Sequence, residues 1–180
     1  MTIATKPKIL LLGLLILLGS TAALFAEEFS QEYQLKLAFM VNFARFIAWP
    51  EESFTAEHPH LTLCVLGKNL FGSALDGVED KKVEGRNLRV KTLEALGKDQ
   101  QCHLLFVGRS EVAGLAGLGS ILGRQSMVTV SDSAGFAAAG GGIEFVLKDD
   151  KLSFVINNTA LKERGVQVSS SLLNLAAAIR

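Results

Sequence analysis

The side chains in this sequence that could carry out chemistry are few and stand apart from one another. His58 and His60 could offer two imidazoles to a metal ion, but no third ligand follows at a suitable spacing, which favours a solvated loop. Asp132 has no second acidic side chain in phase with it, which favours a turn or helix cap over acid–base catalysis. Cys64 and Cys102 could be free buried thiols or the two halves of a disulfide.

Two glycine-rich segments could bring the backbone close to a ligand. Residues 67–73 (GKNLFGS) have the outline of a phosphate-binding loop, but the Lys that precedes the Ser in such loops is missing. Residues 140–142 are three glycines, which allow unusual backbone angles or the close approach of another group, although a flexible turn is the simpler interpretation. We find no combination of nucleophile and base, catalytic carboxylates or metal ligands. The sequence therefore predicts a protein that is not an enzyme and uses no cofactor or metal.

The first 26 residues have the features of a secretory signal peptide. Lys6 and Lys8 form a short basic region, Ile9 to Leu18 is an apolar run, and small residues lead to Ala26, where we place the cleavage. The apolar run is shorter than the roughly 20 residues of a membrane-spanning helix. The remaining residues, 27–180, are enough for one domain with a substantial core.

Charge and export limit the partners of that domain. Two of the 18 basic residues and none of the 18 acidic ones lie in the signal, so the rest has a net charge of −2. Without a basic stripe we expect no nucleic-acid partner, and without a second long apolar segment we expect no stable membrane insertion after cleavage. In an oxidising compartment Cys64 and Cys102 are expected to form a disulfide, which would stabilise the fold by roughly 4 kcal/mol.

Apolar runs and helical segments alternate in the first half of the chain. This order predicts an α/β fold: a single three-layer domain with a mostly parallel sheet, plus a C-terminal antiparallel hairpin with its turn at residues 148–150. Gly165 is expected just beyond a helix, at its C′ position. Helices are predicted over residues 31–49, 70–75, 112–122, 158–164 and 169–179, and strands over residues 61–67, 86–93, 103–108, 127–131, 142–147 and 151–156.

Several residues at the ends of the predicted strands could line a ligand pocket. Ligands of open α/β sheets bind beyond the carboxyl ends of the strands. Gly67, Gly108, Asp132 and Ser133 occupy such positions, so they are the predicted pocket.

The predicted first helix is more apolar than a surface helix. Gln31, Gln34, Asn42 and Arg45 form a narrow polar stripe, and apolar residues take up about two thirds of the circumference. One apolar side can pack on the sheet, whereas the other needs a second helix or another chain. The predicted partner or dimer interface consists of Phe39, Phe43, Phe46 and Trp49.

A series of short motifs resembles a known family. The helix ends Phe46-Ile47-Ala48-Trp49-Pro50, and the runs LTLCVLG, HLLFVG and MVTVSD follow in order. The chain then reads GGIEFVLKDDKLSFVINN and GVQVSSSLLNLA. From about residue 32 to residue 179 this order resembles the YfiR-like family of small periplasmic proteins.

The resemblance implies regulation. Members of this family bind the periplasmic sensor domain of an inner-membrane diguanylate cyclase and hold it inactive, and their release raises cyclic di-GMP and promotes biofilm formation. They are compact α/β domains that tend to form homodimers. The resemblance thus implies a periplasmic inhibitor of a cyclase. The alternative is a periplasmic small-molecule-binding protein without a cyclase partner.

Overall fold

The structure, a computed structural model, describes residues 31–97, 100–114 and 126–180. The predicted signal peptide and most of the predicted helix over residues 112–122 lie outside these ranges. Within them no helix combines the length and the hydropathy that crossing a bilayer requires. After a first helix over residues 31–45, the elements are β1 (Ile47–Ala48), η1 (Glu51–Ser53), β2 (Leu61–Leu66), η2 (Gly72–Leu75), β3 (Lys82–Val83), β4 (Arg86–Leu93), β5 (Leu104–Val107), α2 (Arg109–Gly114), β6 (Val128–Ser131), β7 (Ile143–Lys148), β8 (Lys151–Ile156), α4 (Asn158–Glu163), β9 (Gln167–Val168), α5 (Ser170–Leu175) and β10 (Ala178–Ile179).

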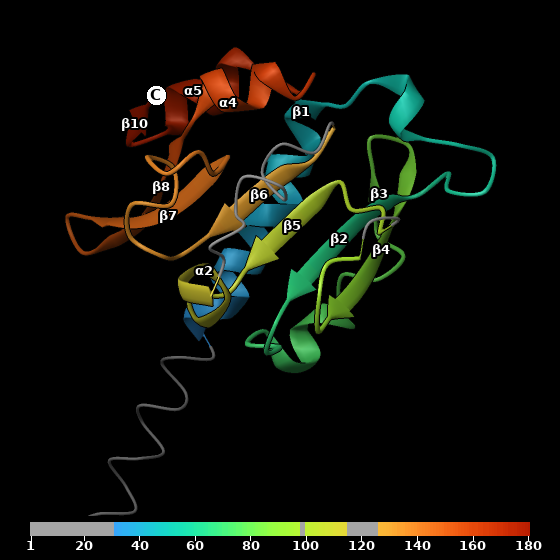
Figure 1. The fold of residues 1–180 in the computed structure, drawn as a ribbon, viewed down its shortest axis with the longest axis horizontal. Coiled ribbons are helices and arrows are strands. Elements are labelled where there is room, and N and C mark those ends of the chain that lie inside the picture. The colour runs from blue at the N-terminus through green and yellow to red at the C-terminus, as the bar shows by residue number, and fades with distance from the viewer. Residues whose placement is uncertain (1–30, 98–99, 115–125) are drawn as a thin grey trace, which may run out of the picture.

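A curled sheet runs through the described part of the domain (Figure 1), with the strand order β10-β8-β7-β6-β5-β2-β4-β3. The central neighbours β4, β2, β5, β6 and β7 pair in parallel. The pairs β7–β8 and β3–β4 are antiparallel. The predicted α/β fold, with a mostly parallel sheet and a C-terminal hairpin, is therefore confirmed.

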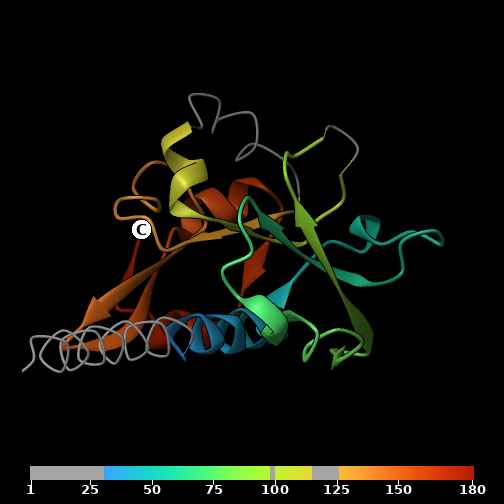
Figure 2. The ribbon, with the colours of Figure 1, turned by 90° about the horizontal axis from the view of Figure 1, so that it is seen from below.

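Both faces of the sheet are covered (Figure 2), with the first helix along one face and α2 over the other. Side chains alternate along β2, so Leu61, Leu63 and Val65 join the larger hydrophobic cluster beneath the first helix. Cys64 and Leu66 point to the other face and join a smaller cluster. Burial on both faces explains why the central strands are apolar at nearly every position.

The hairpin turn follows from its two aspartates. β7 extends to Lys148 and β8 begins at Lys151, so the loop contains only Asp149 and Asp150. Their φ angles are 51° and 56°, as a type I′ turn requires at both central positions. Aspartate tolerates this left-handed conformation better than most residues do, and the predicted hairpin is confirmed.

The first helix ends earlier than predicted. The helix stops at residue 45, and Ile47 and Ala48 instead form β1, which pairs antiparallel with β9. The backbone N–H of Ser169 also donates to the carbonyl oxygen of Phe46, at 2.9 Å. The predicted end at Trp49 was wrong, because this pairing with a distant segment replaces the last helical turn.

The C-terminal segment contains a confirmed cap and a second correction. After α4, Gly165 has a φ of +75°, its N–H donates to Lys162 O, and the N–H of Val166 donates to Leu161 O. These two bonds form a Schellman motif, as the predicted C′ glycine requires. The last helix does not reach Ile179: α5 ends at Leu175, and β10 then pairs in parallel with β8.

Candidate functional site

The sheet brings most of the predicted ligand pocket together. In the register of the parallel strands, Leu66 is paired with Val107 and Val107 with Ser131. The next residue along each of these three strands is a member of the predicted pocket: Gly67, Gly108 and Asp132. They form a row at the carboxyl edge of β2, β5 and β6.

Asp132 is the most heavily engaged residue of this row. Its carboxylate oxygen Oδ2 accepts hydrogen bonds from Tyr33 Oη at 2.8 Å and from Lys36 Nζ at 2.6 Å. The guanidinium Nε of Arg109 donates to the backbone oxygen of Asp132 at 3.1 Å and lies 3.4 Å from Oδ1. Lys36 also pairs with Glu32, one turn earlier, at 2.5 Å. Asp132 therefore ties the first helix and α2 to the end of β6.

The ion pair between Lys36 and Asp132 is buried. The side chains of Lys36 and Asp132 are 1% and 2% exposed, so each charge depends on the other. Burial alone would raise the pKa of Asp132, but the hydrogen bonds from Lys36 and Tyr33 and the charges of Lys36 and Arg109 outweigh it and hold that pKa below its usual value. Burial and the bond to Asp132 raise the pKa of Tyr33.

The prediction that Asp132 is a turn or cap residue missed this role. The position of Lys36 could have revealed the ion pair. Lys36 lies three residues after Tyr33 and four before Met40, within the apolar arc of the helix. A lone cation on an apolar face needs a buried anion. The polar groups of this edge bind one another, which indicates a latch between the helix and the sheet.

Gly67, the first residue of the row, leaves no open space for a ligand. A Cβ added at Gly67 would lie 2.5 Å from the Glu111 side chain. The segment after Gly67 closes on itself, because Asn69 Oδ1 accepts from the N–H groups of Phe71 and Gly72. This local turn connects β2 to η2, and its hydrogen bonds are made within the segment itself.

The three glycines at 140–142 allow the chain to pack closely against itself. Gly140 has a φ of +99°. A Cβ added at Gly141 would lie 2.3 Å from the ring of Phe136, and one at Gly142 would lie 2.9 Å from the backbone oxygen of Thr129. The group that approaches these glycines is therefore the domain's own core.

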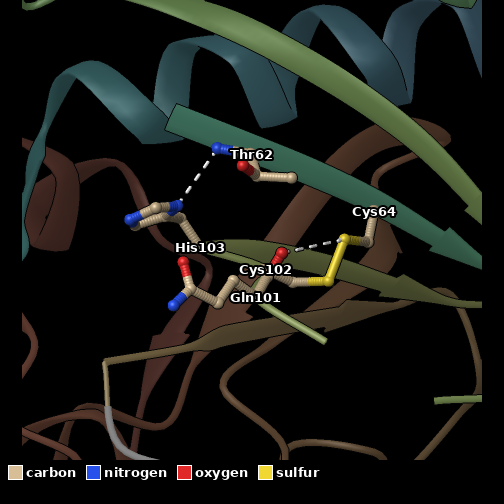
Figure 3. The surroundings of a disulfide bond; sticks show 5 residues. All are labelled: Thr62, Cys64, Gln101, Cys102 and His103. Carbon is tan, nitrogen blue, oxygen red and sulfur yellow. Dashed lines mark hydrogen bonds between the residues drawn. A yellow bond between two sulfur atoms is a disulfide. The ribbon is translucent and has the colours of Figure 1, made fainter. Parts of the chain in front are cut away.

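The predicted disulfide is present in the structure (Figure 3). Cys64 in β2 and Cys102, just before β5, are joined, and their Cα atoms are 5.8 Å apart. The parallel pairing of β2 with β5 brings the two cysteines together. The bridge belongs to the smaller hydrophobic cluster and fastens the segment that leads into β5.

His103, beside the disulfide, is a buried part of the core. Its Nδ1 accepts a hydrogen bond from the backbone N–H of Thr62 at 3.1 Å, as Figure 3 shows. The ring stacks on Phe54 with centroids 4.5 Å apart and meets the ring of Trp49 edge-on. Arg86 lies over the Phe54 ring, 3.6 Å from its centroid.

Burial of His103 makes the protein sensitive to acid. Burial, with a smaller contribution from the charge of Arg86, lowers the pKa of His103 from 6.5 to about 4. The unfolded chain therefore binds a proton in a pH range where the folded chain does not, and we expect stability to fall by about 3 kcal/mol as the pH drops from 6.5 to 4. Urea denaturation at several pH values measures this loss.

Two histidine variants, one at the buried position and one at an exposed position, control this measurement. His103→Asn keeps an acceptor for Thr62 and removes the titration, so the loss of stability between pH 6.5 and 4 should shrink. His58→Asn, at an exposed loop position, should leave it unchanged. Equal pH dependence in the wild type and His103→Asn would refute a buried neutral imidazole.

Across the described residues, no group of three or more His, Cys, Asp or Glu side chains could hold a metal ion.

The four residues of the predicted interface occupy different environments. Phe43 is 1% exposed, and its ring packs against Phe145 and Phe154, so it belongs to the interior of the domain. Phe39 is half-buried and Trp49 also covers part of the core. Phe46, in contrast, is 39% exposed. Of the predicted set, Phe46 therefore presents the most apolar surface for another molecule.

Phe46 borders a groove of about 520 Å³ where the first helix gives way to β1. Two arginines and three aromatic rings contribute to this Phe46 groove, together with strand β9. Its lining includes Arg45, Phe46, Trp49, Phe54, Arg86 and Val168. Glu51, which pairs with Arg86, and Glu84 also line it. Aromatic rings and arginines are enriched in protein-binding hot spots.

Comparison with known proteins identifies the family of this chain. No curated protein sequence matches it. The sequence does match the YfiR/HmsC-like family over residues 33–177, which includes nearly all of the first helix, the strands β1 to β9 and the Phe46 groove. The chain therefore belongs to the YfiR/HmsC-like family.

Proposed function

We propose that this protein is a periplasmic inhibitor that binds the periplasmic sensor domain of an inner-membrane diguanylate cyclase and holds the enzyme inactive. Membership of the YfiR/HmsC-like family over residues 33–177 carries this proposal. The predicted signal peptide and the disulfide support an oxidising compartment. Inhibition requires that the protein bind one conformation of the sensor domain more tightly than the other, because a ligand shifts an equilibrium only by its differential affinity.

The Phe46 groove is the surface that we propose for the sensor domain. Phe46 is exposed although it follows a helix whose other aromatic rings are largely buried. Arg45 makes no ion pair with another described residue, so its guanidinium is open to a carboxylate of the partner. An apolar ring next to a free arginine can anchor a partner by both burial and charge.

The cellular level of cyclic di-GMP tests this function. Deleting the gene should raise cyclic di-GMP, and deleting the partner cyclase as well should abolish the rise. Complementation with Phe46→Ala should fail to restore repression, because the main exposed aromatic anchor is lost. Leu175→Ala is the matched control: Leu175 is 66% exposed but lies on α5 and does not line the groove, so this variant should repress normally.

The deletion tests the proposed function, and the Phe46→Ala variant tests the proposed surface. An unchanged level of cyclic di-GMP in the deletion strain would reject the cyclase-inhibitor function and favour the alternative, a periplasmic small-molecule-binding protein. Full repression by Phe46→Ala would reject only the proposed surface. Immunoblots of periplasmic extracts establish that the variants are exported and equally abundant.

We also propose that the protein forms a homodimer, as the family resemblance implies, and that the exposed side of Phe46 contributes to it. Sedimentation velocity compares the wild type with Phe46→Ala. A folded monomer for the variant supports a dimer built on this surface. A dimeric Phe46→Ala that no longer represses the cyclase would separate the dimer interface from the inhibitory surface.

A further inference from the structure

A second groove, of about 560 Å³, shares Arg45 with the Phe46 groove. One wall consists of first-helix residues from Gln34 to Arg45, and the other of residues from Ser73 to Lys81, the segment that contains η2. Figure 2 shows η2 (green) alongside the first helix. We call this hollow the helix groove. Asp132, Tyr33, Lys36 and Arg109, which form the latch, do not line this groove.

The charge of the helix groove has one sign. Among the described residues, Arg45 and Lys81 are its charged lining residues, and no acidic side chain of this part of the chain lines it. Both cations are exposed, and neither makes an ion pair with another described residue. The side-chain amide of Asn42, also exposed, adds a hydrogen-bond donor to the same wall as Arg45.

The acidic residues near Lys81 are directed elsewhere. Glu79 and Asp80 both pair with Arg89, at 3.0 Å and 2.9 Å. Asp76 lines a different hollow together with Glu79. Neither Glu79 nor Asp80 therefore pairs with Lys81, and Glu84, three residues beyond it, lines the Phe46 groove instead.

The direction of the two walls places the two cations toward the same end of the groove. At one end, Phe71 contacts Tyr33 with ring centroids 5.4 Å apart, so the second wall begins beside the start of the helix. At the other end, Val83 lines the Phe46 groove together with Arg45. The two walls consequently run in the same direction. Arg45 and Lys81, the last lining residue of each wall, lie at one end.

Small residues line the middle of the groove. Ala38 on the helix faces a wall that carries Ala74 and Gly77. Their small side chains leave room above the buried side chains of Leu37 and Val78, which are 2% and 7% exposed. The groove thus combines an apolar middle with a cationic end, which suits a ligand with an apolar body and an anionic head.

We propose that the helix groove binds a small organic anion, a carboxylate or a phosphate ester, with its charged group between Arg45 and Lys81 and its apolar body over Ala38, Ala74 and Gly77. Because Arg45 lines both grooves, the bound anion competes for the same guanidinium as a carboxylate in the Phe46 groove. The binding site itself stands independently of the proposed inhibitory function.

Titration of the purified, ¹⁵N-labelled mature protein tests the site. The probe is phenyl phosphate, with inorganic phosphate as the anion without an apolar body, both at constant ionic strength. Phenyl phosphate should shift the amide resonances of Ala38, Asn42 and Gly77 and should bind more tightly than inorganic phosphate. Arg45→Gln and Lys81→Gln should each weaken its binding about two- to fivefold.

Lys82→Gln is the matched control, because Lys82 is exposed on β3 but lines neither groove. It should bind the probe as the wild type does. Shifts that are absent from the groove, or an equal loss in Lys81→Gln and Lys82→Gln, would overturn the site. Equal binding of the two phosphates would overturn the apolar part of the proposal. Repression by Lys81→Gln in cells should be intact, so failure of this site and failure of the inhibitory surface are distinguishable.

Discussion

Replacing Asp132 by alanine should destabilise the protein by about 3–5 kcal/mol, because the change leaves the buried ammonium of Lys36 without its carboxylate. Glu32, 44% exposed, still reaches Lys36 and limits the loss to this range. Tyr33 Oη also loses its hydrogen bond to this carboxylate. Urea denaturation measures the effect as a lower midpoint with an unchanged slope.

A double variant separates the ion pair from simple loss of packing. Lys36→Met in the Asp132→Ala background removes the stranded charge, so it should recover much of the lost stability. The pH dependence supplies a second test. The pKa of Asp132 is held below its usual value, so its contribution is present above about pH 4 and disappears as the pH falls through the folded pKa. Asp132→Ala with wild-type stability at pH 7 would exclude the latch.

The sequence predicted the central strands well because burial on both faces leaves a strong local signal. Short apolar runs bounded by glycine or polar residues correspond to β2, β5 and β6. The strands β1, β3, β9 and β10 were not predicted, and each has only two residues. Such short pairings depend on contacts between distant segments, and those contacts overrode helical patterns at residues 47–48 and 178–179.

The sequence identified three residues that lie side by side at the edge of the sheet, but not the contacts that they make. Gly67, Gly108 and Asp132 each follow a predicted strand, and the parallel register of β2, β5 and β6 places them side by side. The role of Asp132 depends on Lys36, a residue 96 positions earlier, and hydrophobic periodicity does not specify such pairs. Lys36 on the apolar arc indicated that a buried anion existed, without identifying it.

The aromatic residues of the first helix show the same limit. Phe43 and Phe46 are three positions apart and both fit the apolar pattern. Their environments differ because the helix ends between them and β1 turns toward β9, which carries Phe46 to the surface. A helix extended to Trp49 would have kept both on one face. The distinction between core and surface at Phe46 therefore depends on the end of the first helix, which was predicted incorrectly.

Phe43→Ala should destabilise the domain by about 3–5 kcal/mol, whereas Phe46→Ala should change its stability by much less. The Phe43 ring lies 4.8 Å from that of Phe154 and 5.9 Å from that of Phe145, measured between centroids, so its removal opens a cavity among packed rings. The Phe46 ring is 39% exposed, so its removal leaves mostly solvent-filled space. Denaturation midpoints of the two variants give the comparison directly.

The pair also separates packing from association. Phe43→Ala should lower stability in the monomer and the dimer alike, since its contacts lie within one chain. Phe46→Ala should remain folded and should alter association or cyclase binding in sedimentation and pull-down measurements. Equal destabilisation by both changes would show that the helix continues past residue 45 with Phe46 in the core. A stable Phe43→Ala that fails to associate would instead place Phe43 at the surface between chains.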